Sequence, residues 1–432
     1  MAAQTIQELV RAPKSVNETG LQESVLVDLC LKIIHQNGYA RGLDIADTIQ
    51  LPFADVVEPI IGRIKEEKFV EVRGGQDFGS STMEYSLTER GRNKVTEAMS
   101  RNTYIGPAPI PFERYKLAVQ LQGIREVTVT QEQMKEAMGD LTISPTVFNL
   151  LGPAANSGHS MFLFGKPGNG KTSVAERLSR CLGGEIYTPH AVEFSGSIIK
   201  VFDEIVHTRI ESTVDPTDVA ARVRAGSTDG RWVKTKRPFV MVGGELTLAN
   251  LDLIYHEYSK FYEAPFQMKA NCGIFLIDDF GRQQCRPQDL LNRWIVPLES
   301  RLDFLTLHTG QKINVPFNEL IIFSTNLEPK DLVDEAFLRR IKFKIGFESP
   351  TYEEMVKIFE KMCGLKKIAF AEEAVKYIWK RQYEEKKFEP RSVHPRDILG
   401  QIESIAKYYT VAPKLSKELI DRACDSYFVR LG

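Results

Sequence analysis

Ser160-Met-Phe-Leu-Phe-Gly165-Lys-Pro-Gly-Asn-Gly-Lys171-Thr172 is the stretch that decides the fold. Its first five residues form a compact apolar run, which predicts a buried strand. The next eight match the pattern G-x-x-x-x-G-K-[ST]. Apolar residues then recur at helical spacing until Gly183-Gly184 ends the pattern. The sequence therefore predicts strand, loop and helix in the order that this pattern requires.

The residue types of this loop suit a bound triphosphate. Glycines let backbone N–H groups close around phosphate oxygens, and the start of the following helix adds partial positive charge. Lys171 can reach the β- and γ-phosphates, and the Thr172 hydroxyl suits Mg²⁺. We therefore expect ATP and Mg²⁺ as ligands. The expected nucleotide-binding residues are Gly165, Lys166, Pro167, Gly168, Asn169, Gly170, Lys171, Thr172 and Ser173.

Two further apolar runs end in polar residues. Gly273-Ile-Phe-Leu-Ile leads into Asp278-Asp279, and Leu320-Ile-Ile-Phe-Ser-Thr leads into Asn326. In phosphoryl-transfer sites an aspartate after a strand holds the Mg²⁺ shell, and a neighbouring acid orients the attacking water. We assign Asp278 to the metal, Asp279 to the water, and Asn326 to polarising that water. A simple Asx turn before Glu328-Pro329 is the alternative for Asn326.

These motifs, in this order, resemble the AAA+ ATPases over about residues 126–432. Two later segments fit the resemblance: Asp334-Glu-Ala-Phe-Leu-Arg339-Arg340 and Val393-His-Pro-Arg396. The helical run from Leu290 to Arg301, followed by Leu302-Asp-Phe-Leu-Thr-Leu, is most similar to the MoxR-like branch.

The resemblance implies roles for three arginines. Arg340, with Arg339 beside it, matches the arginine finger that a neighbouring subunit points at the γ-phosphate, and Arg396 matches the second sensor in a helical lid. An arginine there would stabilise charge on the transferred phosphoryl group. Solvated helix ends are the alternative for all three. The family usually has Glu where Asp279 stands. The side chain of Asp279 is one methylene shorter, which predicts either slow hydrolysis or a backbone that lies closer to the attacking water.

The expected fold class is α/β: a P-loop NTPase three-layer parallel sheet with a C-terminal helical lid, preceded by a small α+β winged-helix domain. The expected parts are a flexible tail (1–20), a winged-helix domain (21–102), a Pro-rich linker (103–125), a nucleotide-binding domain (126–350) with an inserted hairpin segment at about 187–270, and a lid (351–432).

The N-terminal segment reads as three helices, a hairpin and a helix, the order of a winged-helix domain. Such domains commonly place their third helix in the DNA major groove. Residues 1–101 carry twelve Lys/Arg against fifteen Asp/Glu, a net charge of −3, and Asp55 and Glu58 lie at the front of that helix. These charges favour protein contact or scaffolding over nucleic-acid binding.

The interval from Lys171 to Asp278 is long for the family. It contains Arg237-Pro-Phe-Val-Met-Val-Gly243-Gly244-Glu-Leu-Thr-Leu, which we interpret as a hairpin. It also contains a basic run with a net charge of +5, which is either a solvated loop or a docking surface for an acidic partner or nucleic acid. The run consists of Arg222, Arg224, Arg231, Lys234, Lys236 and Arg237, with Asp229.

Composition fits an ordinary globular protein. The 432 residues carry a formal net charge of −1 and 43% hydrophobic residues, which disfavours a chain that coats nucleic acid. Six cysteines lie far apart, so neither a zinc site nor a disulfide framework is indicated. We expect no membrane insertion and a cytoplasmic protein.

The expected function is an oligomeric ATPase that remodels or assembles a protein partner. As the AAA+ resemblance implies, its partners would be further copies of itself, in a ring expected to be a hexamer, and a protein client. A nucleic-acid-binding ATPase that uses the winged helix, and a nucleotide switch with little turnover, are the alternatives.

Overall fold

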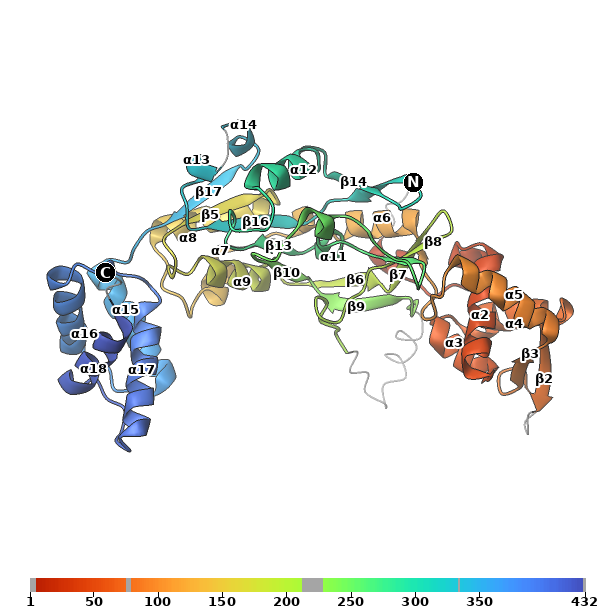
Figure 1. Cartoon of the computed structure of the whole chain (residues 1–432), viewed down its shortest axis with the longest axis horizontal. Coiled ribbons are helices and arrows are strands. Elements are labelled where there is room, and N and C mark those ends of the chain that lie inside the picture. The colour runs from red at the N-terminus through yellow and green to blue at the C-terminus, as the bar shows by residue number, and fades with distance from the viewer. Residues whose placement is uncertain (1–4, 75–78, 212–227, 333–334, 430–432) are drawn as a thin grey trace.

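The computed structural model describes residues 5–74, 79–211, 228–332 and 335–429. Three parts follow one another along the chain in Figure 1: an N-terminal α+β unit, a central α/β unit and a C-terminal helical unit. The central unit lies between the other two.

The central unit is built on a sheet of five parallel strands. Their order across the sheet is β10-β13-β16-β5-β17. The inner strands are continuous apolar runs because both faces of the sheet are covered. The strands are β5 (Met161–Gly165), β10 (Phe239–Val242), β13 (Ile274–Ile277), β16 (Leu320–Thr325) and β17 (Phe343–Phe347). The expected α/β sheet of a P-loop NTPase is thus confirmed.

Alternate residues of β5 point to opposite faces and join separate cores. Met161 and Leu163 pack with residues of α8 (Pro145–Ser157) and α9 (Lys171–Leu182). Phe162, between them, packs with residues of α12 (Pro287–Ser300) on the other face. The central unit therefore has helix, sheet and helix layers. Shorter helices complete them: α7 (Gln131–Ala137), α11 (Phe266–Ala270), α13 (Pro329–Leu332) and α14 (Glu335–Leu338).

The expected hairpin after Arg237 is wrong. Phe239–Val242 is β10, which pairs in parallel with β13 at the edge of the main sheet. One face of an edge strand can meet solvent, so Met241 is exposed between buried Val240 and Val242. That alternation resembles a hairpin strand, which explains the error.

The segment inserted at about 187–270 contributes strands to sheets that are separate from the main parallel sheet. β6 (Glu185–Pro189) and β9 (Trp232–Lys236) make an antiparallel pair. A second five-stranded sheet has the order β11-β12-β8-β7-β4. Its strands are β4 (Ile110–Pro111), β7 (Ala191–Phe194), β8 (Ser197–Lys200), β11 (Ile254–His256) and β12 (Phe261–Glu263). A separate hairpin, β14 (Leu302–Thr306) with β15 (Lys312–Pro316), follows α12.

Residues 103–125 are not a linker. Ile110 and Pro111 form β4, which pairs with β7, and Phe112–Leu121 form helix α6. Phe112, Tyr115 and Val119 are buried in a core with the second sheet. The prolines stop regular structure only up to Pro109, and the amphipathic helix begins directly after Pro111.

The described part of the expected tail, residues 5–20, is also packed. It contains helix α1 (Ile6–Leu9), and Leu9 and Val10 are buried against α6 and Trp232. The Arg114 guanidinium donates to the Leu9 carbonyl oxygen at 3.0 Å. The polar composition of this stretch hid the two apolar residues that anchor it.

The N-terminal unit contains helices around a three-stranded antiparallel sheet of order β1-β3-β2. The expected hairpin is present as β2 and β3, with residues 75–78 outside the described residues. The third of the expected helices begins as a π-helical turn, and Pro59 occupies the first turn of α4, where its missing N–H costs nothing. The elements are α2 (Glu23–Asn37), β1 (Tyr39–Arg41), α3 (Gly42–Ile49), the π-turn (Phe53–Val57), α4 (Glu58–Glu66), β2 (Val70–Gly74), β3 (Glu84–Leu87) and α5 (Glu89–Arg101).

The C-terminal unit is helical and has its own core. Its first helix is capped by Thr351, whose side chain accepts from the Glu354 N–H while the Glu354 carboxylate accepts from the Thr351 N–H. The elements are α15 (Tyr352–Lys366), α16 (Glu372–Ile378), a π-helical segment (Trp379–Glu385), α17 (His394–Tyr408) and α18 (Lys417–Tyr427).

Candidate functional site

The loop between β5 and α9 has the backbone of a phosphate cradle. Gly165, Gly168 and Gly170 have φ values of 132°, 82° and 87°, a region that residues with a Cβ rarely adopt. A Cβ at Gly165 would also lie 2.2 Å from the carbonyl oxygen of Phe347 on β17. The glycines are therefore required by geometry as well as by the motif.

The loop carries backbone donors that are not used within the protein's described residues. Within the described residues, no acceptor receives the backbone N–H groups of residues 168 to 173. The last of these belong to the first turn of α9, where N–H groups have no partner within the helix. Unpaired backbone N–H groups at the start of a helix are donors that bind phosphate oxygens.

Lys171 lies between the loop and the sheet. Its ammonium donates to the carbonyl oxygens of Gly165 at 2.7 Å and Lys166 at 3.0 Å, and to Asn326 Oδ1 at 2.8 Å. Burial lowers the pKa of this ammonium, while the nearby carboxylates of Asp278 and Asp279 act in the opposite direction. The side chain is thus a cation held at the mouth of the cradle.

A hydroxyl and a carboxylate meet next to it. Thr172 Oγ1 donates to Asp278 Oδ2 at 2.9 Å, and Asp278 Oδ1 accepts the Asp279 N–H at 3.0 Å. Oxygen donors of this kind suit Mg²⁺, which takes few protein ligands and completes its shell with water and phosphate. Thr172 and Asp278 therefore fit the expected metal site.

Asp279 and Asn326 face one another across β13 and β16. Asn326 Nδ2 donates to Asp279 Oδ1 at 2.8 Å, so the amide of Asn326 connects Lys171 with Asp279. Asp279 is exposed and has a φ of 47°, the left-handed region. Gln283, which sequence analysis missed, fixes this turn by donating to the carbonyl oxygens of Asp278 and Asp279.

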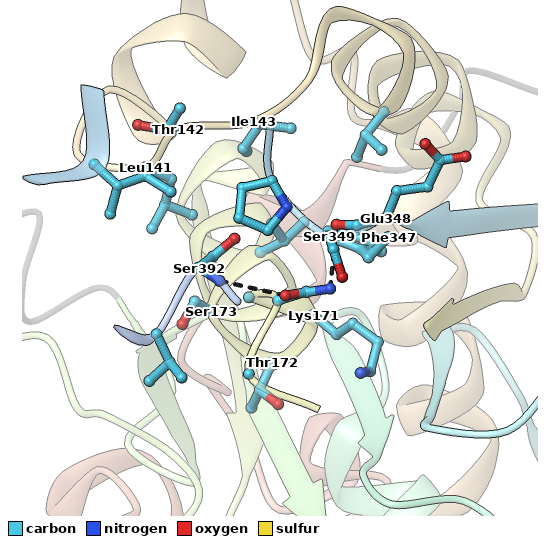
Figure 2. A pocket seen from close by; sticks show the side chains of 18 of the residues that line it. Leu141, Thr142, Ile143, Lys171, Thr172, Ser173, Phe347, Glu348, Ser349 and Ser392 are labelled. Atoms are coloured by element: carbon cyan, nitrogen blue, oxygen red, sulfur yellow. Dashed lines mark hydrogen bonds between the residues drawn. The ribbon is translucent and has the colours of Figure 1, made fainter. Parts of the chain in front are cut away.

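Lys171, Thr172, Asp278, Asp279 and Asn326 line a cavity of about 790 Å³, within the usual range for small-molecule sites. Figure 2 shows Lys171, Thr172 and Ser173 below, with Leu141 to Ile143 and Phe347 to Ser349 above them. Ile358 and Met362 of α15 also line the cavity. The segment 140–147 and these helix residues could not be found from the sequence, because they belong to no motif and lie far along the chain from the phosphate loop.

The three arginines have different places. Arg396, at the start of α17, lines the cavity and its Nε donates to Asp397 at 2.9 Å. Arg339 pairs with Glu335 at 3.1 Å, and Arg340 pairs with Glu299 at 2.6 Å. Neither Arg339 nor Arg340 lines the cavity, so the finger role stays a prediction about a neighbouring copy.

Two arginines of the basic run are bound within the protein. Arg231 is fully buried and pairs with buried Asp229, and the Arg237 guanidinium donates to the carbonyl oxygens of Gln122 and Cys272. Lys234 pairs with Glu185. Arg222 and Arg224 lie outside the described residues. Both earlier interpretations of the run, a solvated loop and a docking surface, are therefore wrong for Arg231 and Arg237. Lys236 is exposed, so for it they stay predictions.

Known proteins similar to this chain are one protein family and a set of solved structures. Residues 351–426 match a family described as a domain of unknown function (DUF8689). No curated protein matches the chain. Within the described residues, no helix is long and apolar enough to cross a membrane.

Two similar solved structures are the RuvB Holliday junction branch migration motor of Thermotoga maritima and NtrX of Brucella abortus in complex with ADP. The first is 13% identical with a TM-score of 0.35, covering 69% of this chain and 70% of that chain. The second is 13% identical with a TM-score of 0.40, covering 80% of this chain and 68% of that chain. Both scores lie below 0.5, so the fold class rests on the chain's own features. Its strand order and phosphate cradle define an α/β protein of the P-loop NTPase class.

Proposed function

We propose that this chain is an ATPase of the AAA+ type. The observation that carries the proposal is the meeting of Lys171, Thr172, Asp278, Asp279 and Asn326 in one cavity, from three neighbouring parallel strands and the cradle. The free N–H groups of the cradle give the triphosphate its seat, and the segment around Leu141 to Ile143 leaves an apolar place for the base.

The residues divide the work of hydrolysis. Lys171 and the cradle neutralise phosphate charge, and Thr172 with Asp278 would hold Mg²⁺, which supplies further charge neutralisation between the β- and γ-phosphates. Asp279 orients the water, and Asn326 fixes the Asp279 carboxylate from the adjacent strand. Arg396 reaches the cavity from the helical unit and stabilises charge on the phosphoryl oxygens.

The assembly belongs to the same proposal. Arg340 or Arg339 of a neighbouring copy completes the site in a ring, for which we propose a hexamer. The resemblance to the MoxR-like branch and the winged-helix order of the N-terminal unit support a role in remodelling or assembling a protein client. An Asp279→Asn variant that binds ATP without hydrolysing it should retain that client in a pull-down.

The test is ATP turnover and particle size for Lys171→Ala and Arg340→Ala. Lys171→Ala should abolish binding and turnover. Arg340→Ala should keep binding and lose turnover. Arg286→Ala is the matched control, because Arg286 is exposed and, among the residues the structure describes, its ion pair is with Asp289 in the first turn of α12. Normal binding and hydrolysis by Lys171→Ala would show that the assignment is wrong.

A nucleotide switch with little turnover is the second candidate. The short carboxylate of Asp279, exposed and already engaged by Asn326, favours it. Asp279→Glu should then raise a weak hydrolysis rate while binding stays as it was. The nucleic-acid alternative has less support, because Arg231 and Arg237 are used inside the protein. Absence of DNA binding at low salt would remove it.

A further inference from the structure

One residue of the phosphate cradle faces the helical unit instead of the cavity's ligand groups. Asn169 is 6% exposed and its amide is used on both sides. Nδ2 donates to the Glu348 carbonyl oxygen at 3.1 Å, and Oδ1 accepts the Ser392 N–H at 3.3 Å. Both bonds are the dashed lines in Figure 2.

The two hydrogen-bond partners of Asn169 lie at the exit from the central sheet and just before helix α17. Glu348 directly follows β17, where the chain leaves the central sheet for α15. Ser392 lies two residues before α17, the helix whose first turn carries Arg396. A single amide therefore joins the cradle to the exit from the sheet and to the segment that positions Arg396.

Neighbouring contacts reinforce the junction. The Val393 N–H donates to the Gly168 carbonyl oxygen at 2.9 Å, and a Cβ on Gly168 would lie 2.7 Å from Val393 Cγ1. Lys166 pairs with Glu389 at 3.0 Å, and Glu389 also accepts from the Ser349 hydroxyl at 3.3 Å. This pair is exposed, so we expect it to contribute little. The contacts of Asn169, whose side chain is buried, are the ones that can hold a fixed geometry.

We propose that Asn169 is a positioning residue that transmits occupancy of the phosphate cradle to the helical unit. Phosphate draws the N–H groups of the cradle toward itself, and Asn169 carries that shift to Glu348 and Ser392. The position of Arg396 then depends on the cradle even before Arg396 touches a ligand. The inference rests on the proposed nucleotide site and concerns how that site is regulated.

The experiment compares hydrogen exchange of residues 386–397 with and without ADP in the full chain. Adding ADP to the wild type should slow exchange at the Ser392 and Val393 amides. In Asn169→Ala the Ser392 amide should exchange about 5-fold faster, because its N–H loses roughly one hydrogen bond. The protection that ADP adds across this segment should disappear, and turnover should fall more than nucleotide affinity.

Two further variants separate coupling from simple destabilisation. Asn169→Asp keeps the acceptor for Ser392 but loses the donor to Glu348, so it should restore part of the protection. Asn156→Ala also removes two bonds of a side-chain amide, here an exposed one, to the Val129 N–H at 2.7 Å and the Val129 carbonyl oxygen at 3.0 Å elsewhere in the central unit. It should leave the response to ADP intact.

The outcomes are distinct. An ADP response in Asn169→Ala equal to that of the wild type overturns the inference and leaves the proposed function standing. Loss of the response in Asn156→Ala as well overturns it too, because ordinary destabilisation then explains the effect. A wild type that does not bind ADP overturns the proposed function together with the inference.

Discussion

Removing the partner of one buried arginine should destabilise the protein more than any change at its surface. Arg231 and Asp229 are both 0% exposed. The Arg231 guanidinium donates to both Asp229 oxygens, at 2.8 to 3.1 Å, and to the carbonyl oxygens of Thr19 at 3.1 Å and Pro109 at 3.3 Å. Asp229→Ala would leave that guanidinium buried without a counter-charge.

The magnitude follows from desolvation. Breaking a fully buried pair from one side costs about 3–5 kcal/mol, because the remaining charge has lost water and gained nothing. The exposed pair of Arg339 with Glu335, at 76% and 83% exposure, should contribute at most about 0.5 kcal/mol. Asp229→Ala and Glu335→Ala therefore delete the same chemistry with an expected difference of several kcal/mol.

Urea unfolding monitored by tryptophan fluorescence suits the measurement. Trp232 is buried directly after Arg231, and its backbone N–H donates to the Asp229 carbonyl oxygen at 3.1 Å. The transition should move to lower urea in Asp229→Ala and stay in place in Glu335→Ala. The double variant Asp229→Ala with Arg231→Met should recover much of the loss, since it removes the stranded charge. Equal midpoints for Asp229→Ala and the wild type would refute the reasoning.

Four other changes have defined outcomes. Burial, assisted by Arg391, lowers the pKa of His394 to about 4, below its ordinary 6.5, so the helical unit should lose stability as pH falls from 6.5 toward 4; this residue alone should cost about 2 kcal/mol at pH 5, and thermal unfolding of His394→Gln should show a shallower decline between pH 7 and 5. A Cβ on Gly273 would lie 2.1 Å from the Pro238 carbonyl oxygen, so Gly273→Ala should cost about 1–3 kcal/mol or more in urea unfolding. Gly62→Ala, with nothing within 4 Å of its Cβ position inside α4, should instead stabilise by about 0.5–1 kcal/mol. Trp294→Ala should cost about 3–5 kcal/mol, because this side chain is fully buried in the core between α12 and the sheet, and an unchanged melting temperature would contradict that placement.

The centre of the site was predictable because its signals are local. The strand, loop and helix around Lys171 lie within one continuous stretch, and Asp278 and Asn326 each follow an unmistakable buried strand. Neighbouring parallel strands bring their carboxyl ends to one edge, so these residues meet in space without any further information. Their hydrogen bonds to Lys171 and Thr172 follow from that arrangement.

The errors came from contacts between distant residues. Ile110 pairs with Val192 and Tyr262 pairs with Ile199, and periodicity within a window cannot reveal such partners. Pro109 and Pro111 suggested a linker, although the residues after them pack into a core. Arg231 looked like a surface cation because its two backbone acceptors, the carbonyl oxygens of Thr19 and Pro109, lie far away along the chain.

The anchor at Arg231 also constrains motion. Its bonds to Thr19 and Pro109 tie the stretch that leads into α2 and the stretch that leads into α6 to the same guanidinium. Moving the N-terminal unit away from the central unit would break these buried hydrogen bonds of Arg231, at a free-energy cost of many times the thermal energy. The N-terminal unit should therefore move with the central unit as one rigid body.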